Sequence, residues 1–397
     1  MATPKSRQRN VLISGGLFHV YHDSIADGLA VLLPFWKIAF DLSLAQVGLV
    51  TTCFEGATAL FQVPAGFLGE RYGERILLTL GTVATAACFI MIGFAGNIYA
   101  LGALLVAGGL GAGVQHPLAA AMISKAYARG NQRIVLGTYN FTGDMGKFLF
   151  PALAAFVLMV TDWRSLCVGY GALGLLMTAC LYRLLCSSHA GGIETEPGGK
   201  RCRNRGWGII NKRAFVFLSG IGFIDTAVRA ALITFLPFLL IEKSMPMEKA
   251  GLALALLYIG GALGKFLCGV LAERIGVIPS IVATEALSGL GILYLYAMPL
   301  PAVLPFLPLL GLALHGTSSV LYGSVADFVS PSHVPRAFGL FYTVIISAAA
   351  VCPPALGMFG DTFGLGAATI VLGLVALTTL PLTVLLHKAA ATSQGVP

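Results

Sequence analysis

The chain has 397 residues, of which 57% are hydrophobic and only 11% are charged. Soluble domains carry roughly a quarter charged residues, so this composition excludes a soluble globular protein and indicates that most of the chain lies in lipid. The formal net charge of +8 does not indicate a nucleic-acid-binding protein, because the cations follow the loops between apolar segments.

Apolar segments of about 20 residues or more recur from end to end, and a helix of that length crosses a hydrocarbon core of about 30 Å. The first segment is not expected to be a cleaved signal peptide, because it is long, has polar residues in its middle and lacks a small-residue cleavage site. We therefore predict an all-α membrane protein. Its twelve spans are predicted at 11–35, 44–68, 76–95, 98–123, 134–159, 164–186, 213–240, 247–271, 278–297, 301–326, 337–360 and 364–387.

The basic residues of the loops predict how the chain crosses the membrane, since cytoplasmic loops are enriched in Lys and Arg. With the N-terminus inside, the opposite face carries only Lys37, Arg164, Lys243 and Lys249. We expect both termini in the cytoplasm of a bacterial cell, with the chain in the inner membrane. The basic residues predicted to be cytoplasmic are Lys5, Arg7, Arg9, Arg71, Arg75, Lys125, Arg129, Arg133, Lys200, Arg201, Arg203, Arg205, Lys212, Arg213, Arg274, Arg336 and Lys388.

A polar break in the middle of the chain divides it into two halves of six spans. Ser, Gly and Pro residues and a basic cluster interrupt the hydrophobicity there. The predicted organisation is a cytoplasmic tail at 1–10, a first half at 11–186, a cytoplasmic linker at 187–212, a second half at 213–387 and a cytoplasmic tail at 388–397.

The second half repeats the first at a shift of 203 residues. The landmarks that coincide are 33–35 (Leu-Pro-Phe) with 236–238, 66–73 with 269–276, and Pro151 with Pro354. Several landmarks at one shift indicate two parallel structural repeats, an architecture found in membrane transporters.

The repeated loop is predicted to be a conformational latch formed by Gly66, Glu70, Arg71, Gly73 and Arg75 and, in the second half, by Gly269, Glu273, Arg274 and Gly276. The first glycine of each copy is expected to let two helices approach closely, and the last to permit a tight turn. The Glu–Arg pairs lie where helices leave the membrane, so they can stabilise one of two conformations. The alternative is that these charges only set the topology.

The first copy of this loop resembles the hallmark motif Gly-x-Leu-x-Asp-Arg-x-Gly-Arg-Arg of the major facilitator superfamily. The matching residues are Gly66, Leu68, Arg71, Gly73 and Arg75, and the departures are Glu70 and Glu74. The resemblance implies twelve transmembrane helices in two pseudo-symmetric halves, with the first, fourth, seventh and tenth helices around a central cavity.

Shorter motifs are similar to the fosmidomycin-resistance type of efflux protein in this superfamily. They are His19-Val20-Tyr21-His22-Asp23, Gln62, His116-Pro117, Tyr322 and Gly360-Asp361. This resemblance implies proton-driven export, with phosphonate-type antibiotics as the precedent. The fifth span also resembles the motif of major facilitator exporters through Gly137, Gly143, Gly146 and Pro151, although these residues can instead serve helix packing.

Ionisable residues inside the predicted spans mark the candidate site, because a charge in a bilayer is costly unless it lines a cavity or pairs. Spacings of four residues place Asp23 on one helical face with His19 and with Asp27. Burial favours the protonated carboxyl, and a histidine one turn away can share the proton. Asp23 with His19 is therefore the leading proton-coupling candidate, followed by Asp27, Glu55 and Asp225.

Lys147 and Arg229 are predicted to be electropositive contacts for an anionic solute. Asp144 and Asp225 lie three and four residues from these cations, so the pairs can alternatively neutralise each other and only hold helices in place. The predicted solute-binding residues are Lys147, Arg229, Asp144, His116, Gln62, His315 and Tyr322.

The sequence thus predicts a secondary active transporter of a small polar or anionic organic solute, working by alternating access, with proton-coupled export favoured. The first alternative is proton-coupled uptake of an organic anion such as a carboxylate. The second is transport of a metal or metal chelate by His19, His22 and Asp23, since imidazole and carboxylate are metal ligands.

Other classes of protein lack support in the sequence. No H-E-x-x-H, G-x-S-x-G or P-loop motif occurs, which argues against an enzyme and against ATP-driven transport by this chain. The eight cysteines show neither metal-ligand nor disulfide spacing. We expect no cofactor, no resident metal and a monomer whose partners are the solute, protons and the lipid bilayer.

Overall fold

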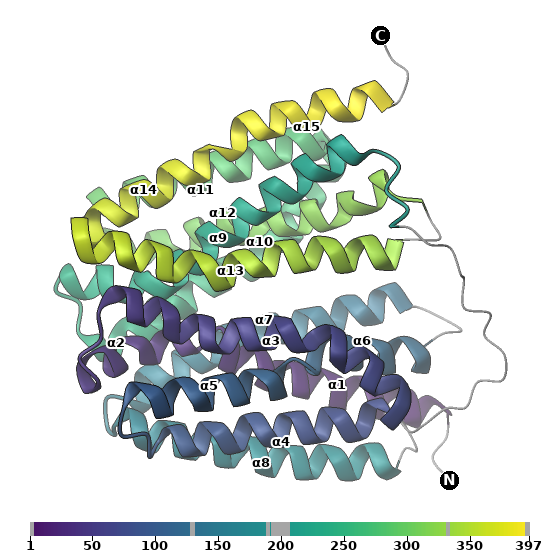
Figure 1. The fold of residues 1–397 in the computed structure, drawn as a ribbon, viewed down its shortest axis with the longest axis vertical. Coiled ribbons are helices and arrows are strands. Elements are labelled where there is room, and N and C mark those ends of the chain that lie inside the picture. The colour runs from purple at the N-terminus through teal and green to yellow at the C-terminus, as the bar shows by residue number, and fades with distance from the viewer. Residues whose placement is uncertain (1–3, 128–131, 188–190, 192–206, 331–333, 394–397) are drawn as a thin grey trace. The chain divides into compact units, whose positions relative to one another are not determined.

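The protein is almost entirely helical in its computed structural model, which describes residues 4–127, 132–187, 191, 207–330 and 334–393 (Figure 1). The helices before the linker are α1 (Pro4–Ala26), α2 (Leu29–Ala39), α3 (Leu44–Tyr72), α4 (Glu74–Ile92), α5 (Ile98–Ala112), α6 (Gln115–Ala126), α7 (Gln132–Val157) and α8 (Trp163–Ser187). The helices after it are α9 (Lys212–Glu242), η1 (Met247–Lys249), α10 (Ala250–Ile275), α11 (Val277–Ala297), α12 (Leu300–Ser324), η2 (Val325–Phe328), α13 (Val334–Phe363), α14 (Leu365–Leu377) and α15 (Thr379–Ser393).

These helices correspond to the twelve predicted spans, three of which are interrupted. The first span consists of α1 and α2, the fourth of α5 and α6, and the twelfth of α14 and α15. The break in the first span lies at Asp27 and Gly28, where a Cβ on Gly28 would collide with the Ser24 carbonyl and the Phe150 ring. The chain therefore needs glycine at this bend.

Among the described residues, ten helical segments are long and apolar enough to cross a membrane. The two predicted spans missing from that set are 11–35 and 134–159, which contain α1 and α7. These two polar helices pack against each other. Their mutual packing keeps ionisable side chains away from lipid, where they would be costly.

Contacts in space divide the chain into two compact units. The first consists of residues 1–41 and 50–199, and the second of residues 42–49 and 200–397. The first turn of α3 thus belongs to the second unit. Asp361 of α13 binds this turn, because its Oδ1 accepts a hydrogen bond from the Leu44 amide at 2.7 Å and its Oδ2 one from the Ala45 amide at 2.9 Å. A carboxylate at a helix N-terminus stabilises the helix.

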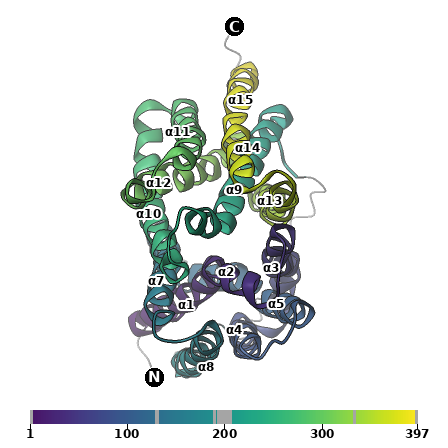
Figure 2. The same cartoon turned by 90° about the vertical axis from the view of Figure 1, so that its left-hand side faces the viewer.

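In the first unit, α1 packs on α7 and α4 packs on α5 and α8, as the adjacent α4 and α8 of Figure 2 illustrate. Its core includes Val11, Phe18, Leu118 and Ile123. In the second unit, the closest pairs are α10 with α12, α9 with α13 and α11 with α14. A Cβ on Gly260 would collide with the Pro308 carbonyl, so a small residue is required where α10 meets α12.

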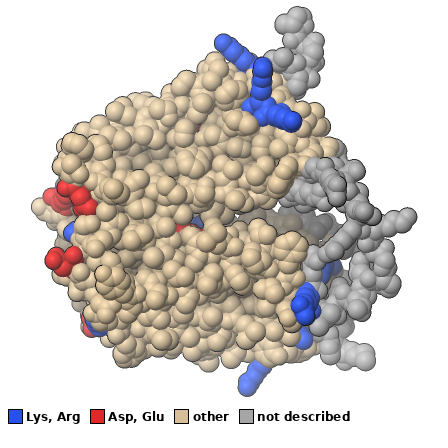
Figure 3. All heavy atoms as spheres, viewed as in Figure 1, with Lys and Arg blue, Asp and Glu red and all other residues tan. Residues whose placement is uncertain are grey.

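The surface of each unit agrees with a membrane-spanning protein. On the face that Figure 3 shows, charged side chains gather near the helix ends, and the middle shows almost only uncharged side chains. Large apolar side chains are exposed along the helices, among them Leu60, Phe67, Leu176 and Phe266. Such a surface is stable in hydrocarbon and unfavourable in water.

The repeated loop confirms one prediction and contradicts another. Gly73 and Gly276 have φ angles of 81° and 95°, so both turns need glycine. The prediction that Gly66 and Gly269 permit close helix approach is wrong, since a Cβ on either would meet no heavy atom of the described residues within 4 Å. The close contact in this part of α3 is made at the next turn, where a Cβ on Gly69 would collide with Leu118.

Among the described residues, the Glu–Arg pairs of the repeated loop show no ion pair that would form the predicted latch, so the latch stays a prediction. The Glu70 side chain lies outside the described residues. Arg71 is exposed and lies 5.3 Å from the centre of the Tyr72 ring. Glu273 and Arg274 are exposed, and neither forms an ion pair with another described residue.

Candidate functional site

The candidate site is built where α1 crosses α7 in the first unit. His19, His22 and Asp23 of α1 are 4%, 7% and 5% exposed. They fit against α7 because a Cβ on Gly143 would fall 2.5 Å from the His19 ring and 2.7 Å from Asp23 Oδ2. Gly143, which resembled part of an exporter motif, thus makes room for the polar cluster.

His19 is fixed by contacts at both ring nitrogens. Its Nδ1 lies 2.9 Å from the Tyr139 carbonyl oxygen, and its ring stacks on the Tyr139 ring with centroids 4.2 Å apart. A carbonyl only accepts hydrogen bonds, so Nδ1 carries a proton. Nε2 is the nitrogen left to face Asp23.

His19 Nε2 lies 3.3 Å from Asp23 Oδ1. With Nδ1 protonated, a neutral His19 would present a lone pair to a carboxylate, which is repulsive. The contact is favourable when a second proton lies on the pair, either on Nε2 or on the carboxyl group. A second proton would therefore stabilise the contact of His19 with Asp23, whose role in proton coupling stays a prediction.

The two oxygens of Asp23 face different partners. Oδ1 lies 2.9 Å from His22 Nδ1 and 3.9 Å from His116 Nε2. Oδ2 lies 3.5 Å from Lys147 Nζ. The His116 side chain is 44% exposed, so the buried cluster is open on the His116 side. His116, predicted to contact the solute, joins the predicted proton-coupling residues.

Lys147 joins α7 to the break in the first span. Its Nζ lies 3.0 Å from Asp27 Oδ2. Glu55 of α3 lies within electrostatic range of Asp27 and Lys147, and Asp144 within range of Lys147. The ion pairs of Lys147 thus run to Asp23 of α1 and to Asp27 directly after it, whereas the alternative drawn from the sequence paired it with Asp144 on its own helix.

In the second unit, the predicted pair of Asp225 and Arg229 is present, with Arg229 Nη2 3.9 Å from Asp225 Oδ2. Arg229 also donates to Thr226 Oγ1 at 3.3 Å. His315 is 4% exposed and lies 3.2 Å from the Gly311 carbonyl through Nδ1. Its ring lies edge-on to Tyr258 of α10, and its role in solute binding stays a prediction. The two remaining candidates are half-buried: Gln62 on α3, and Tyr322, which stacks on Tyr342.

His22, predicted only as a ligand in the metal alternative, contacts Asp23, and its Nε2 is buried with no hydrogen-bond partner in the described part of the chain. Three further polar residues of functional interest were not among the predicted site residues. Tyr139 supplies the carbonyl for His19. Glu285 is 2% exposed. Glu74 is buried and lies 2.6 Å from Lys125 Nζ. In the sequence, the only feature that marks Glu74 and Glu285 is that each acidic residue lies in or beside a hydrophobic segment.

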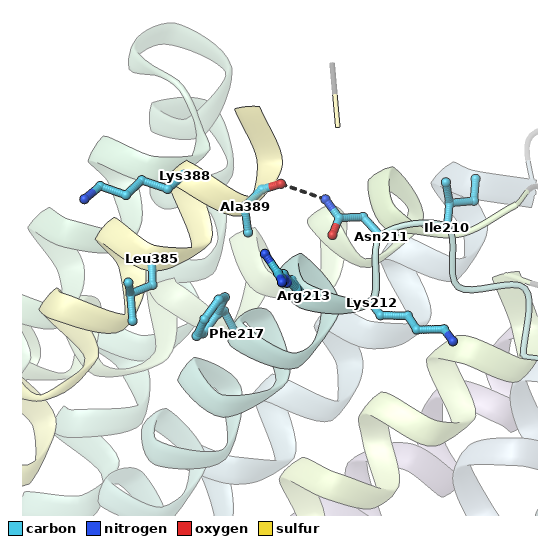
Figure 4. Close-up of a pocket in the computed structure, with 8 residues that line it drawn as sticks. All are labelled: Ile210, Asn211, Lys212, Arg213, Phe217, Leu385, Lys388 and Ala389. Carbon is cyan, nitrogen blue, oxygen red and sulfur yellow. Dashed lines mark hydrogen bonds between the residues drawn. The ribbon is translucent and has the colours of Figure 1, made fainter. Parts of the chain in front are cut away.

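A surface pocket lies elsewhere, at the start of α9 and the end of α15 (Figure 4). Asn211 joins the two helices there by donating to the Ala389 carbonyl at 2.8 Å. Lys212, Arg213 and Lys388 give the pocket a positive charge. None of the predicted solute-binding residues lines it, and it lies at helix ends, so it is not the candidate solute site.

The comparisons with known proteins agree with this architecture. A sequence profile described as Major Facilitator Superfamily matches residues 15–244 and 218–396. The chain belongs to the major facilitator superfamily. It is therefore a membrane transporter of small solutes and not an enzyme, and its twelve helices form the two halves of the major facilitator fold.

Individual relatives of this major facilitator chain are distant. It is 26% identical over 161 residues to the fosmidomycin resistance protein of Escherichia coli (strain K12), a match that covers 40% of this chain and only 39% of that protein. It is 24% identical over 370 residues to the gallate transporter of Pseudomonas putida, covering 84% of this chain and 79% of that protein.

A solved structure shows the same fold. The crystal structure of a bacterial homolog to the human lysosomal transporter Spinster, in an inward-facing and unoccupied conformation, superimposes with a TM-score of 0.76. It is 19% identical and covers 97% of this chain and 96% of that chain.

Proposed function

We propose that this chain is a proton-coupled transporter of a small organic anion, and that it carries the proton and the anion together. The observation that supports the proposal is the position of Lys147. It is held by Asp27 at 3.0 Å and by Asp23 at 3.5 Å, and Asp23 also contacts His19. Asp23 therefore contacts both Lys147, the cation that would bind the solute, and His19, its partner in the proposed proton site.

Charge explains how the two ligands would be linked. With both aspartates ionised, Lys147 protonated and His19 neutral, these four groups carry a net charge of −1, which repels an anion. Adding one proton to the His19–Asp23 pair brings the net charge of the four groups to zero. It also weakens the attraction between Asp23 and Lys147. The ammonium group can then exchange a carboxylate partner for the solute. Protonation thus favours anion binding, and by linkage the anion favours protonation by the same factor.

Positive linkage of this kind favours co-transport. An inward proton gradient would then drive uptake of the anion, the first alternative considered from the sequence. The gallate transporter among the relatives supports this choice of solute class. We further propose, from the distribution of basic residues, that both termini lie in the cytoplasm of a bacterial cell.

Export in exchange for protons is the second candidate, as expected of a fosmidomycin-resistance type of protein. The match to the Escherichia coli fosmidomycin resistance protein supports it. Exchange requires the solute and the proton to compete, which would happen if the solute bound Asp23 directly.

Proteoliposomes distinguish the two directions of coupling. Labelled gallate, other small carboxylates and phosphonates would be offered with the outside more acid than the inside, and then with the gradient reversed. Co-transport predicts accumulation with the acid outside. Accumulation only with the acid inside would support exchange, and equal uptake in both gradients would contradict proton coupling.

Transport of a transition-metal ion is a third candidate because ligand atoms of His19, Asp23 and His116 lie within 4.8 Å of one another. The contact of His19 Nδ1 with a backbone carbonyl also leaves Nε2 available as a metal ligand. Lys147 opposes this function by placing a positive charge 3.5 Å from Asp23. Titration with Zn²⁺ and Ni²⁺ would test it, since a metal site requires binding that is lost in His116→Gln.

A further inference from the structure

The positively charged pocket of Figure 4 lies between the start of α9 and the end of α15, two helices that pack against each other. Its volume is about 700 Å³, within the size range of ligand-binding sites. Lys212, Arg213 and Lys388 are exposed residues of its lining, and Arg213 lies between the two lysines in Figure 4. No acidic residue is among the described residues that line it. The pocket therefore fits the negatively charged part of a ligand.

The positive charge of this pocket is not neutralised by neighbouring carboxylates. Neither Lys212 nor Arg213 forms an ion pair with another described residue. The first turn of α9 adds partial positive charge, because the first amide groups of a helix have no intrahelical partner. The Asn211 side chain accepts a hydrogen bond from one of them, the Ala214 amide, at 3.0 Å. An anionic group would thus gain charge-assisted hydrogen bonds at this place.

Hydrogen bonds hold the frame of the pocket in place. Asn211, at the start of α9, donates to the Ala389 carbonyl of α15 at 2.8 Å. The amide of Ile210, another lining residue, donates to the Phe328 carbonyl at the end of η2 at 2.9 Å. Because the backbone is already fixed, binding of a ligand would cost little ordering of the protein.

The part of the pocket that lies deeper in the predicted spans is apolar. Phe217 follows Arg213 by four residues, and Leu385 precedes Lys388 by three. These spacings place each apolar side chain on the same helical face as a basic one, about one turn further into the span. The pocket therefore offers cations at its outer edge and hydrocarbon below them.

The apolar surface continues from the pocket onto both helices. Val216 and Val384, which are neighbours in sequence of two lining residues, are 65% and 51% exposed, and Ile210 is 70% exposed. Such side chains are stable in contact with lipid chains and unfavourable in water. The three basic residues lie within one residue of the predicted span boundaries at 213 and 387, which is the level of the phospholipid headgroups.

We propose that this pocket binds an anionic phospholipid. Lys212, Arg213 and Lys388 would hold the phosphate group, and Phe217 and Leu385 would contact the start of the acyl chains. A role in topology accounts for cations at helix ends, but it does not account for an apolar pocket beside them. The apolar lining also favours a lipid over inorganic phosphate, which has no hydrocarbon to bury there.

A lipid bound in this pocket would bridge the seventh and twelfth spans at their ends. It would stabilise the second unit, because a ligand that binds only the folded chain shifts the unfolding equilibrium. The pocket contains none of the residues proposed to bind the solute or the proton. The inference therefore goes beyond the proposed function and does not depend on it.

Native mass spectrometry of the purified full chain in detergent tests the site by counting the lipids that stay bound. The chain is titrated with dioleoyl phosphatidylglycerol and, separately, with dioleoyl phosphatidylcholine, which has the same acyl chains and no net charge. We expect tighter retention of phosphatidylglycerol. Arg213→Gln should raise its half-saturating concentration about fivefold. Arg183→Gln is the matched control, because it removes an exposed cation near the end of α8, and it should leave that concentration unchanged.

Equal retention of the two lipids would overturn the proposal, as would equal weakening in Arg213→Gln and Arg183→Gln. If Arg213→Gln does not fold, Lys212→Gln provides the same comparison with the control. Inorganic phosphate at millimolar concentration should leave phosphatidylglycerol bound. Displacement of the lipid by phosphate would overturn the assignment to a lipid and indicate a site for a small free anion.

Discussion

The ammonium group of Lys147 lies 3.0 Å from Asp27 Oδ2, and Asp27 lies between the end of α1 and the start of α2. A single ion pair thus ties α7 to the bend of the first span. Lys147 also contacts Asp23. A substitution of Asp27 therefore changes the ion pairing of the Lys147 ammonium group and leaves the His19–Asp23 contact in place.

Asp27→Asn should therefore increase the affinity for the anion at alkaline pH. Lys147 loses one competing carboxylate, and a hydrogen bond between charged groups contributes about 1.5–3 kcal/mol, so the KM should fall by roughly 10- to 100-fold. The measurement is the KM of proteoliposome uptake across a pH series. Asp41→Asn is the control, because Asp41 is exposed and has a φ of 48° that asparagine accepts. A KM that rises in Asp27→Asn would contradict the role of Lys147.

Gly143→Ala should abolish gradient-driven transport while leaving a folded protein. The added methyl group meets the His19 ring and Asp23, so the pair loses its geometry at a cost of about 1–3 kcal/mol in stability. Gly137→Ala on the same helix is the matched control, since its Cβ would meet nothing within 4 Å among the described residues. Driven transport that survives in Gly143→Ala would show that the His19–Asp23 contact is dispensable.

Gly73→Ala should destabilise the protein by about 1–3 kcal/mol, because alanine does not readily adopt a φ of 81° with a ψ of 146°. Gly66→Ala should have a far smaller effect, or a slightly stabilising one, since its Cβ enters open space within a helix. Thermal unfolding of the purified variants gives the comparison. Equal losses in both variants would mean that Gly66 packs in another conformation of the cycle.

Lys125→Met should destabilise the first unit. It leaves Glu74, which is 4% exposed, without the ammonium group 2.6 Å away. Because Lys125 is itself half exposed, we expect a loss of about 1–3 kcal/mol. The double variant with Glu74→Gln should recover part of the loss in a thermal unfolding assay. Lys249→Met, at an exposed position, is the control, and a double variant less stable than Lys125→Met would contradict the pairing.

The sequence predicted the fold well because its signals are local or repeated. Span length follows from hydrophobicity, and the two halves follow from the repeat at 203 residues. The breaks within the first, fourth and twelfth spans were not predicted, since glycine is common in transmembrane helices and a break depends on what a Cβ would meet. Gly28 shows this, because its neighbour Phe150 is distant in sequence.

The sequence predicted only part of the candidate site. Helical spacing placed Asp23 on one face with His19 and Asp27, and the structure confirms this through the shared Lys147. Contacts between helices were not predictable. Spacing suggested Asp144 as the partner of Lys147, whereas Lys147 forms its ion pairs with Asp23 and Asp27.

The most direct test of the central claim is to count protons when the anion binds. The anion identified by proteoliposome uptake would be added to the purified chain in weak buffer with a pH indicator. The positive linkage at Lys147 predicts that wild-type protein takes up protons on binding and that Asp23→Asn takes up fewer. Release of protons, or equal uptake in wild-type protein and Asp23→Asn, would contradict the claim that the His19–Asp23 proton and the anion are carried together.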